Sequence, residues 1–90
     1  MNRSRVDVSA QILQSAAGGS TRIRIQYNTF LSHSHLDAYL QKLKEGGLLE
    51  HVDTLNTFRT TDAGHRFLKL YNQIVECIDP EQVGISAASR

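Results

Sequence analysis

The side chains best suited to chemistry are four histidines and one cysteine, and their spacing argues against a reaction or a metal centre. His33 and His35 lie two residues apart in a helix-like segment, so they point roughly 200° apart and cannot hold one ion together. His51 and His65 have no cysteine or carboxylate at ligand spacing. We find no serine–histidine–acid arrangement, carboxylate pair or phosphate-binding glycine loop. The sequence therefore predicts no enzyme, no metal site, no cofactor and no small-molecule substrate.

Cys77 is the single cysteine, so the chain forms no disulfide within itself, which fits a reducing compartment. It falls in an apolar stripe of helical period, where we expect a small buried hydrophobe; a reactive or interchain thiol is the alternative. The amino terminus lacks an apolar run of signal-peptide length, and no stretch approaches the ~18 apolar residues of a membrane span. We therefore expect a soluble, cytoplasmic protein.

A second kind of chemistry, hydrogen bonding to phosphates or base edges, is available where a helix is predicted to begin at Ser32. His33, Ser34 and His35 follow it, and helix amino termini attract phosphate through their unpaired backbone amides. Asp37 would repel phosphate unless it accepts a hydrogen bond from a cytosine amine. A plain polar helix start is the alternative interpretation. Protonation of His33 and His35 would make DNA affinity sensitive to mildly acid pH.

Hydrophobic periodicity predicts the elements that position these groups. Helices are expected over about 4–17, 22–27, 33–46 and 61–78, with short strands over 48–52 and 57–60 joined by a hairpin loop at 53–56. Glycine pairs end the first and third helices, Asn28 is expected to end the second, and Pro80 follows the fourth. The predicted inward positions are Val6, Ala10, Leu13 and Ala17, widened by Val8 and Ile12; Ile23 and Tyr27; and Leu36, Tyr39, Leu40 and Leu43.

The length and the charge distribution favour one small domain with an anionic partner. Ninety residues allow only a small core, which a second subunit would help to stabilise. The net charge is +1, but residues 1–44 carry six Arg or Lys against two Asp, and residues 45–90 carry four against seven acidic residues. The basic half suggests a face for phosphates. Arg3, Arg5, Arg22 and Arg24 are its arginines, and ordinary solvated charge is the alternative.

Five stretches spread over roughly half the chain carry a resemblance: Thr21-Arg22-Ile23, Leu31-Ser32, Leu36-x-x-Tyr39-Leu40-x-x-Leu43, Gly47-Leu48-Leu49 and Thr61-x-x-Gly64-x-x-Phe67-Leu68. As a set they resemble the small winged-helix DNA-binding proteins of archaea, the ten-kilodalton "a" class of chromatin-associated proteins, and related winged helix-turn-helix regulators. The resemblance implies double-stranded DNA binding without a cofactor, and a homodimer held by an antiparallel coiled coil of carboxyl-terminal helices. Two features differ from the family: the last helix is short, about 18 residues or ~27 Å, and the wing carries Asp53 but no lysine.

The expected fold is α+β and mostly α: a winged helix-turn-helix of three helices and a two-stranded wing, with an additional carboxyl-terminal dimerisation helix. Residues 1–79 would form the domain and residues 80–90 a flexible tail. With the third helix in the major groove, the predicted DNA contacts are Arg22, Arg24, Ser32, His33, Ser34, His35, Asp37, Gln41, Lys42 and, on the wing, Arg59. The predicted dimer interface is Phe67, Leu70, Tyr71, Ile74, Val75 and Ile78.

These features predict a transcription regulator or a chromatin-associated factor of the nucleoid. Two-fold symmetry would place two half-sites about one helical turn, or a multiple, apart on the DNA. Two alternatives stay open. A winged helix can serve protein–protein contact, which the near-neutral charge and the acidic wing favour, or it can be a non-specific architectural DNA binder.

Overall fold

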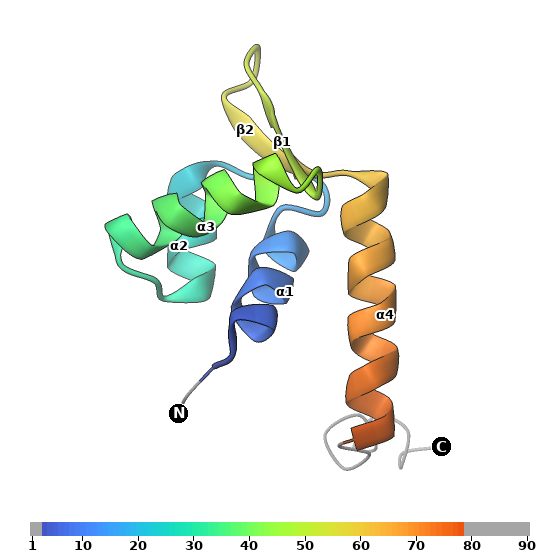
Figure 1. Cartoon of the computed structure of the whole chain (residues 1–90). Helices are drawn as coiled ribbons and strands as arrows, with labels where there is room; N and C mark the ends of the chain where they lie inside the picture. The colour runs from blue at the N-terminus through green and yellow to red at the C-terminus, as the bar shows by residue number, and fades with distance from the viewer. Residues whose placement is uncertain (1–2, 79–90) are drawn as a thin grey trace.

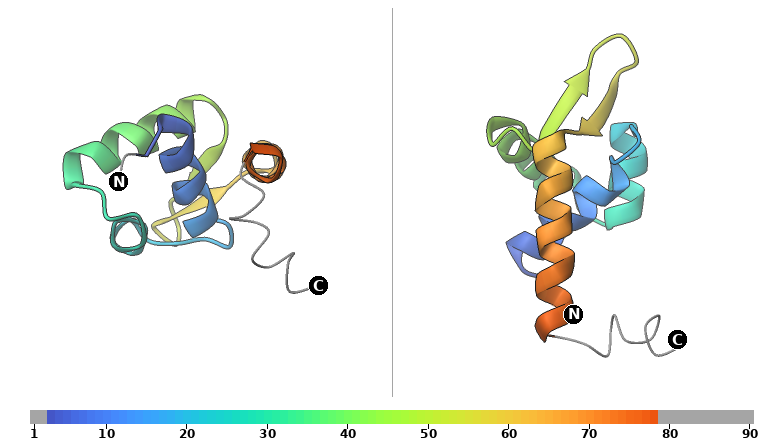
Figure 2. Two further views of the ribbon diagram at one scale, coloured as in Figure 1. Left: turned by 90° about the horizontal axis from the view of Figure 1, so that it is seen from below. Right: turned by 90° about the vertical axis from the view of Figure 1, so that its right-hand side faces the viewer.

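The computed structural model describes residues 3–78, which form helices around a small core and one projecting hairpin (Figure 1). The order is α1 (Arg5–Ser15), α2 (Arg22–Thr29), α3 (His33–Glu45), β1 (Leu49–Val52), β2 (Thr57–Thr60) and α4 (Asp62–Ile78). The first three helices cluster together, the β1–β2 hairpin extends from one side of the cluster, and α4 runs beside α1 (Figures 1 and 2). The predicted tail, residues 80–90, lies outside the described residues.

Each helix begins at a hydroxyl side chain that caps it. The side-chain oxygens of Ser4, Thr21, Ser32 and Thr61 each accept a hydrogen bond from the backbone N–H three residues later, at 3.0 to 3.3 Å. At α1 the cap is reciprocal, because the Asp7 carboxylate accepts from the Ser4 backbone N–H. Such caps contribute about 1 kcal/mol each. They explain why the predicted helix starts agree with the structure to within a residue.

The core is centred on α1, which lies between α2 and α4. The fully buried large side chains of the core include Ile12, Leu13, Ile25 and Leu36. The remaining core members are Val8, Ala10, Ala16, Leu40, Leu43, Leu49 and Leu68. The predicted inward stripe of α1 is wrong at its ends. Val6 is half exposed, and Ala16 is buried where Ala17 was expected. Because α1 contacts elements on two sides, its buried face is wider than a single stripe and is rotated from the predicted one.

The inward face of α2 is also predicted wrongly. Ile23 and Tyr27 are each 78% exposed, whereas Ile25 and Thr29 are buried. Thr29 can be buried because its hydroxyl donates to the Ile25 carbonyl at 2.8 Å, which satisfies the polar atom. The helix also continues past Asn28 to Thr29, and its C-cap residue is Phe30, whose φ of 58° is left-handed.

The third helix and the hairpin agree with the prediction. Leu36, Leu40 and Leu43 are buried and Tyr39 is partly buried, while the strands pair antiparallel from Leu49↔Thr60 to Val52↔Thr57. Ser20 exchanges two backbone hydrogen bonds with Phe58, and the Thr60 hydroxyl donates to the Leu13 carbonyl at 2.6 Å. These bonds attach the base of the hairpin to the helices. Three helices followed by a projecting hairpin form a winged helix, so the predicted fold class is confirmed.

The fourth helix packs against the body at its start and is open at its end. Gly64 and Leu68 are its buried residues, and the distal half extends past α1 (Figure 1). Cys77 lies in this distal half and is exposed. The expectation of a buried cysteine is therefore wrong within one chain, because α1 is too short to cover the last turns of α4.

Candidate nucleic-acid interface

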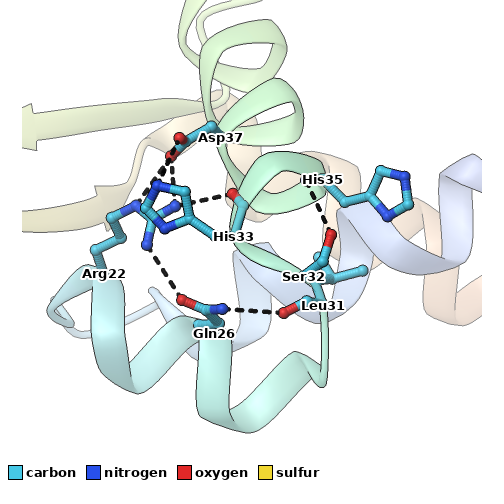
Figure 3. Close-up of polar contacts among 7 residues, drawn as sticks. All are labelled: Arg22, Gln26, Leu31, Ser32, His33, His35 and Asp37. Atoms are coloured by element: carbon cyan, nitrogen blue, oxygen red, sulfur yellow. Dashed lines mark hydrogen bonds and ion pairs between the residues drawn. The ribbon is translucent and has the colours of Figure 1, made fainter.

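The start of α3 is fixed to α2 by the side chain of Arg22 (Figure 3). Its Nε and Nη2 donate to Asp37 Oδ1 at 2.9 and 2.5 Å, and Nη2 also donates to the His33 carbonyl at 2.9 Å. Nη1 donates to Gln26 Oε1 at 3.1 Å, and the Gln26 amide in turn donates to the Leu31 carbonyl at 3.2 Å. One guanidinium thus joins both helices and the turn between them.

This network changes what Arg22 and Asp37 can do. The Arg22 side chain is only 26% exposed, and its charge is compensated by Asp37. In this structure Arg22 therefore positions α3. The Asp37 carboxylate also has His33 Nε2 at 3.3 Å. The repulsion of phosphate that the sequence predicts for Asp37 is accordingly reduced by the neighbouring Arg22 guanidinium.

The first turn of α3 presents an open polar surface. Ser32, His33, Ser34 and His35 are all exposed, and the Ser32 hydroxyl accepts from the His35 backbone N–H at 3.3 Å. Figure 3 shows the His33 and His35 rings on opposite sides of the helix, as their spacing predicts. Within residues 3–78, no three His, Cys, Asp or Glu side chains gather as a metal ligand set.

Further cations lie along α3 and on α2 without an acidic partner. Lys42 and Lys44 are exposed in the last turn of α3, and Arg24 is exposed on α2. None of these three belongs to an ion pair within residues 3–78, where the ion pairs join Arg22 and His33 to Asp37, His51 to Asp53, and Arg59 to Glu50. Gln41 is exposed on the same helix and donates to Glu45 at 2.9 Å. Three unpaired positive charges are therefore available to phosphates.

The wing offers less positive charge than the sequence suggests. Arg59 faces Glu50 across the two strands and donates to Glu50 Oε2 at 3.0 and 2.8 Å. His51 lies 2.7 Å from Asp53 and 3.1 Å from Asn56, with its ring tilted against Phe58. Since Arg59 is already paired, a phosphate would have to displace Glu50 to reach it.

The predicted dimer interface divides into two groups in the structure. Phe67, Tyr71 and Val75 are partly buried within the protomer, and the Phe67 and Tyr71 rings lie parallel with centroids 6.5 Å apart. The Tyr71 hydroxyl donates to Asp7 Oδ1 at 2.5 Å, which joins α4 to the start of α1. This bond, with those from Ser4, lowers the pKa of Asp7. The same bond, together with burial, raises the pKa of Tyr71 to about 12.

The second group forms an unpartnered apolar stripe. Leu70, Ile74 and Ile78 follow one another at four-residue spacing and are 59%, 56% and 76% exposed. This spacing keeps all three on one side of α4. In the described part of the chain they have no covering element, which is the property expected of a helix that pairs with another.

Sequence reasoning missed a second exposed apolar stripe, on α2. Ile23, Tyr27 and Phe30 are 78%, 78% and 85% exposed. The first two were interpreted as core because i, i+4 apolar spacing is the signal of a buried face. The buried face of α2 contains the polar residue Thr29, so it does not show the apolar pattern of an inward face. The sequence therefore carries no signal that distinguishes the buried face of α2 from its exposed face.

The arrangement of α2, α3 and the hairpin now has a counterpart among known families. Residues 2–79 match the family model described as winged helix-turn-helix. The chain belongs to the winged helix-turn-helix family. No curated protein matches it. Winged helix-turn-helix domains typically bind DNA and are not enzymes, so membership suggests a DNA-binding regulator. Among residues 3–78, no helix is long and apolar enough to span a membrane.

Proposed function

We propose that this winged helix-turn-helix protein binds double-stranded DNA with α3 in the major groove. The observation that carries the proposal is the exposed polar first turn of α3, which Arg22 and Asp37 hold in place. Lys42 and Lys44 on the same helix form no ion pair within residues 3–78. In helix-turn-helix proteins such a turn presents side chains to base edges while neighbouring elements contact the backbone.

Within this proposal the residues have different tasks. Ser34 and Gln41 are exposed on α3 and carry groups that can donate to and accept from bases, and Ser32, His33 and His35 surround the same helix start. Arg24, Lys42 and Lys44 neutralise phosphates. Arg22 and Asp37 are positioning residues, and Arg59 contributes only when its bond to Glu50 is exchanged for one to DNA.

We further propose a homodimer through the distal half of α4. The stripe of Leu70, Ile74 and Ile78 is apolar and is not covered by any other part of residues 3–78. Burying such side chains contributes about 1.5–3 kcal/mol each when burial is complete. α4 has 17 residues, or about 25 Å of helix, which limits the paired region to a short antiparallel contact. Such a dimer would place two α3 helices on successive major grooves.

A regulator or chromatin-associated factor of the nucleoid is the biological role that we propose for this dimer. The support is the family membership together with the likeness of five sequence stretches to small archaeal chromatin-associated proteins. Non-specific architectural binding is a variant of the same role, in which unrelated duplexes would bind almost equally.

The DNA proposal is tested by selecting duplexes from a random library and measuring affinity by fluorescence anisotropy. For the selected duplex we expect Gln41→Ala to weaken binding by about tenfold or more, as loss of a base contact does. Asn72→Ala on α4 is the matched control for an exposed amide-bearing helix residue. An equal effect of both variants, or no enrichment of any sequence, would contradict direct reading of bases by α3.

The dimer proposal is tested by light scattering. We expect the wild type to have twice the protomer mass of 10.1 kDa, and Ile74→Asp to be monomeric, because a charge in the apolar contact would be desolvated. Asn72→Asp changes an exposed residue on the other side of the same helix and should remain dimeric. A wild type that stays monomeric at high concentration would refute the contact.

A second function, protein–protein contact, is favoured by one specific observation. The α2 stripe of Ile23, Tyr27 and Phe30 is exposed and lies opposite the buried face of its helix, and the adjacent wing is charge-compensated. If the chain binds a protein partner in place of DNA, Tyr27→Ser should abolish binding to that partner, while Lys44→Gln should leave this binding unchanged. The DNA proposal predicts the reverse order of effects.

A further inference from the structure

A groove between α1 and α3 combines an apolar floor with two cations. It has a volume of about 400 Å³, and its lining residues are Arg5 and Ser9 from α1 and Ala38, Tyr39, Lys42 and Leu43 from α3. The volume lies within the roughly 300–1,000 Å³ of small-molecule sites. None of the lining residues comes from the wing or from α4.

The lining residues of the groove combine apolar side chains with positive charge only. Ala38, the ring of Tyr39 and Leu43 make the surface mostly apolar, and the charged groups are Arg5 and Lys42, with no carboxylate among the lining residues. Neither cation takes part in an ion pair within residues 3–78. The hydroxyls of Ser9 and Tyr39 add two further donors. A groove lined by two positive charges and by apolar side chains complements an anion that has an apolar body.

We propose that this groove binds a small amphipathic anion, of the class of medium-chain carboxylates. The carboxylate would lie between Arg5 and Lys42 and the hydrocarbon part against Ala38 and Leu43. A DNA phosphate would satisfy the two cations but leaves the apolar floor uncovered, so the lining favours the small molecule. Because Lys42 also lies on the exposed side of α3, an occupied groove would withdraw one cation from any other anion that approaches this helix.

Octanoate, butyrate, 1-octanol and inorganic phosphate are the probes for this site, used with the full chain and without DNA. Binding is measured by titration calorimetry, and the location by amide NMR shifts at Arg5, Ser9 and Lys42. We expect octanoate to bind at least tenfold more tightly than butyrate, since a fully buried methylene contributes about fourfold. Octanol, which has no charge, should bind more weakly than octanoate.

Two variants with a matched control test the lining itself. Lys42→Met keeps the length of the side chain but removes its charge, and should weaken octanoate binding by about fivefold, the upper range for one exposed charge pair. Ala38→Leu adds bulk to the lining and should weaken binding at least tenfold, while far-ultraviolet circular dichroism checks that the variant is folded. Lys69→Met on α4 lies outside the lining and should bind as the wild type does.

Several results would overturn the proposal. Equal binding of octanol and octanoate would show an apolar groove without anion recognition, and equal binding of phosphate would show a cation pair without a groove. Absence of octanoate binding up to about 10 mM, far weaker than the usual range of specific ligands, would show that no site exists. Since no DNA is present, each result is independent of the DNA-binding proposal.

Discussion

Replacing Gly64 by alanine should destabilise the protein although alanine is the better helix former. A Cβ at this position would lie 2.5 Å from Thr60 Cγ2 and closer still to the carbonyl oxygen of Leu48. Real Cβ atoms are essentially never closer than 3.0 Å to such atoms. The carbonyl belongs to the backbone at the base of the hairpin, so it cannot move aside by a side-chain rotation. The first turn of α4 must therefore shift away from the hairpin.

The expected loss of stability on Gly64→Ala follows from two opposing free-energy contributions. Alanine gains about 1 kcal/mol over glycine in a helix interior, whereas forcing an extra methyl group into a packed contact costs about 1–3 kcal/mol, and more against backbone. We expect a net loss of about 1–2 kcal/mol, which corresponds to a fall in Tm of roughly 4–15 °C for a domain of this size. Thermal unfolding followed by circular dichroism, at one protomer concentration, measures it.

Gly46 provides a matched control within the same molecule. It ends α3 with a φ of −80°, and a Cβ there would meet its nearest atom, the Lys42 carbonyl oxygen, at an ordinary 3.5 Å. Gly46→Ala should therefore leave Tm unchanged or raise it slightly. A Gly64→Ala protein as stable as the wild type would refute the close contact between α4 and the hairpin.

Three further changes test individual contacts. Tyr71→Phe removes the bond that lowers the pKa of Asp7. A carboxylate with a depressed folded pKa stabilises the fold above its ordinary pKa of 3.8, and this contribution is lost as the pH falls through the folded pKa. Urea unfolding should therefore show a difference from wild type at about pH 6 that shrinks as the pH falls below 3.8. Arg22→Met and Asp37→Asn should be less than additive by about 0.5–1 kcal/mol in a double-mutant cycle of unfolding, and strict additivity would show that the pair contributes nothing. Phe30→Asn should raise the free energy of unfolding by about 0.5 kcal/mol, because asparagine tolerates the left-handed region better than phenylalanine. Little packing is lost, because the Phe30 side chain is exposed. A lower Tm of the variant would mean that the Phe30 ring is covered in solution.

Much of the architecture follows from local signals in the sequence. The helices that are predicted to begin at Ser32 and Thr61 are capped by those hydroxyl residues, and the two strands differ from the prediction by one residue at most. These features depend on hydrogen bonds between residues a few positions apart. Local chemistry therefore determines them almost alone, which is why they are predictable.

Features that depend on distant residues were not predictable to the same degree. The pair of Arg22 and Asp37 spans 15 positions, and the sequence treats both as independent side chains that face DNA. The orientation of α2 depends on whether Thr29 or Tyr27 meets the core, and a satisfied threonine hydroxyl decides it. The exposure of Cys77 depends on where α1 ends beside α4. In each case the arrangement of neighbouring elements, which the local pattern does not contain, decides the outcome.

The most direct test of the central claim, DNA binding by this winged helix, is the affinity for random-sequence duplex DNA across a salt series. Arg24, Lys42 and Lys44, which form no ion pair among the described residues, allow six phosphate contacts from two protomers. The logarithm of the binding constant should therefore fall with the logarithm of the salt concentration with a slope of about −5. Lys44→Gln should make this slope shallower by about 2 in the dimer, and Lys69→Gln should leave it unchanged. Absence of binding at about 50 mM salt, where electrostatic affinity is strong, would contradict the account and favour the α2 stripe as the functional surface.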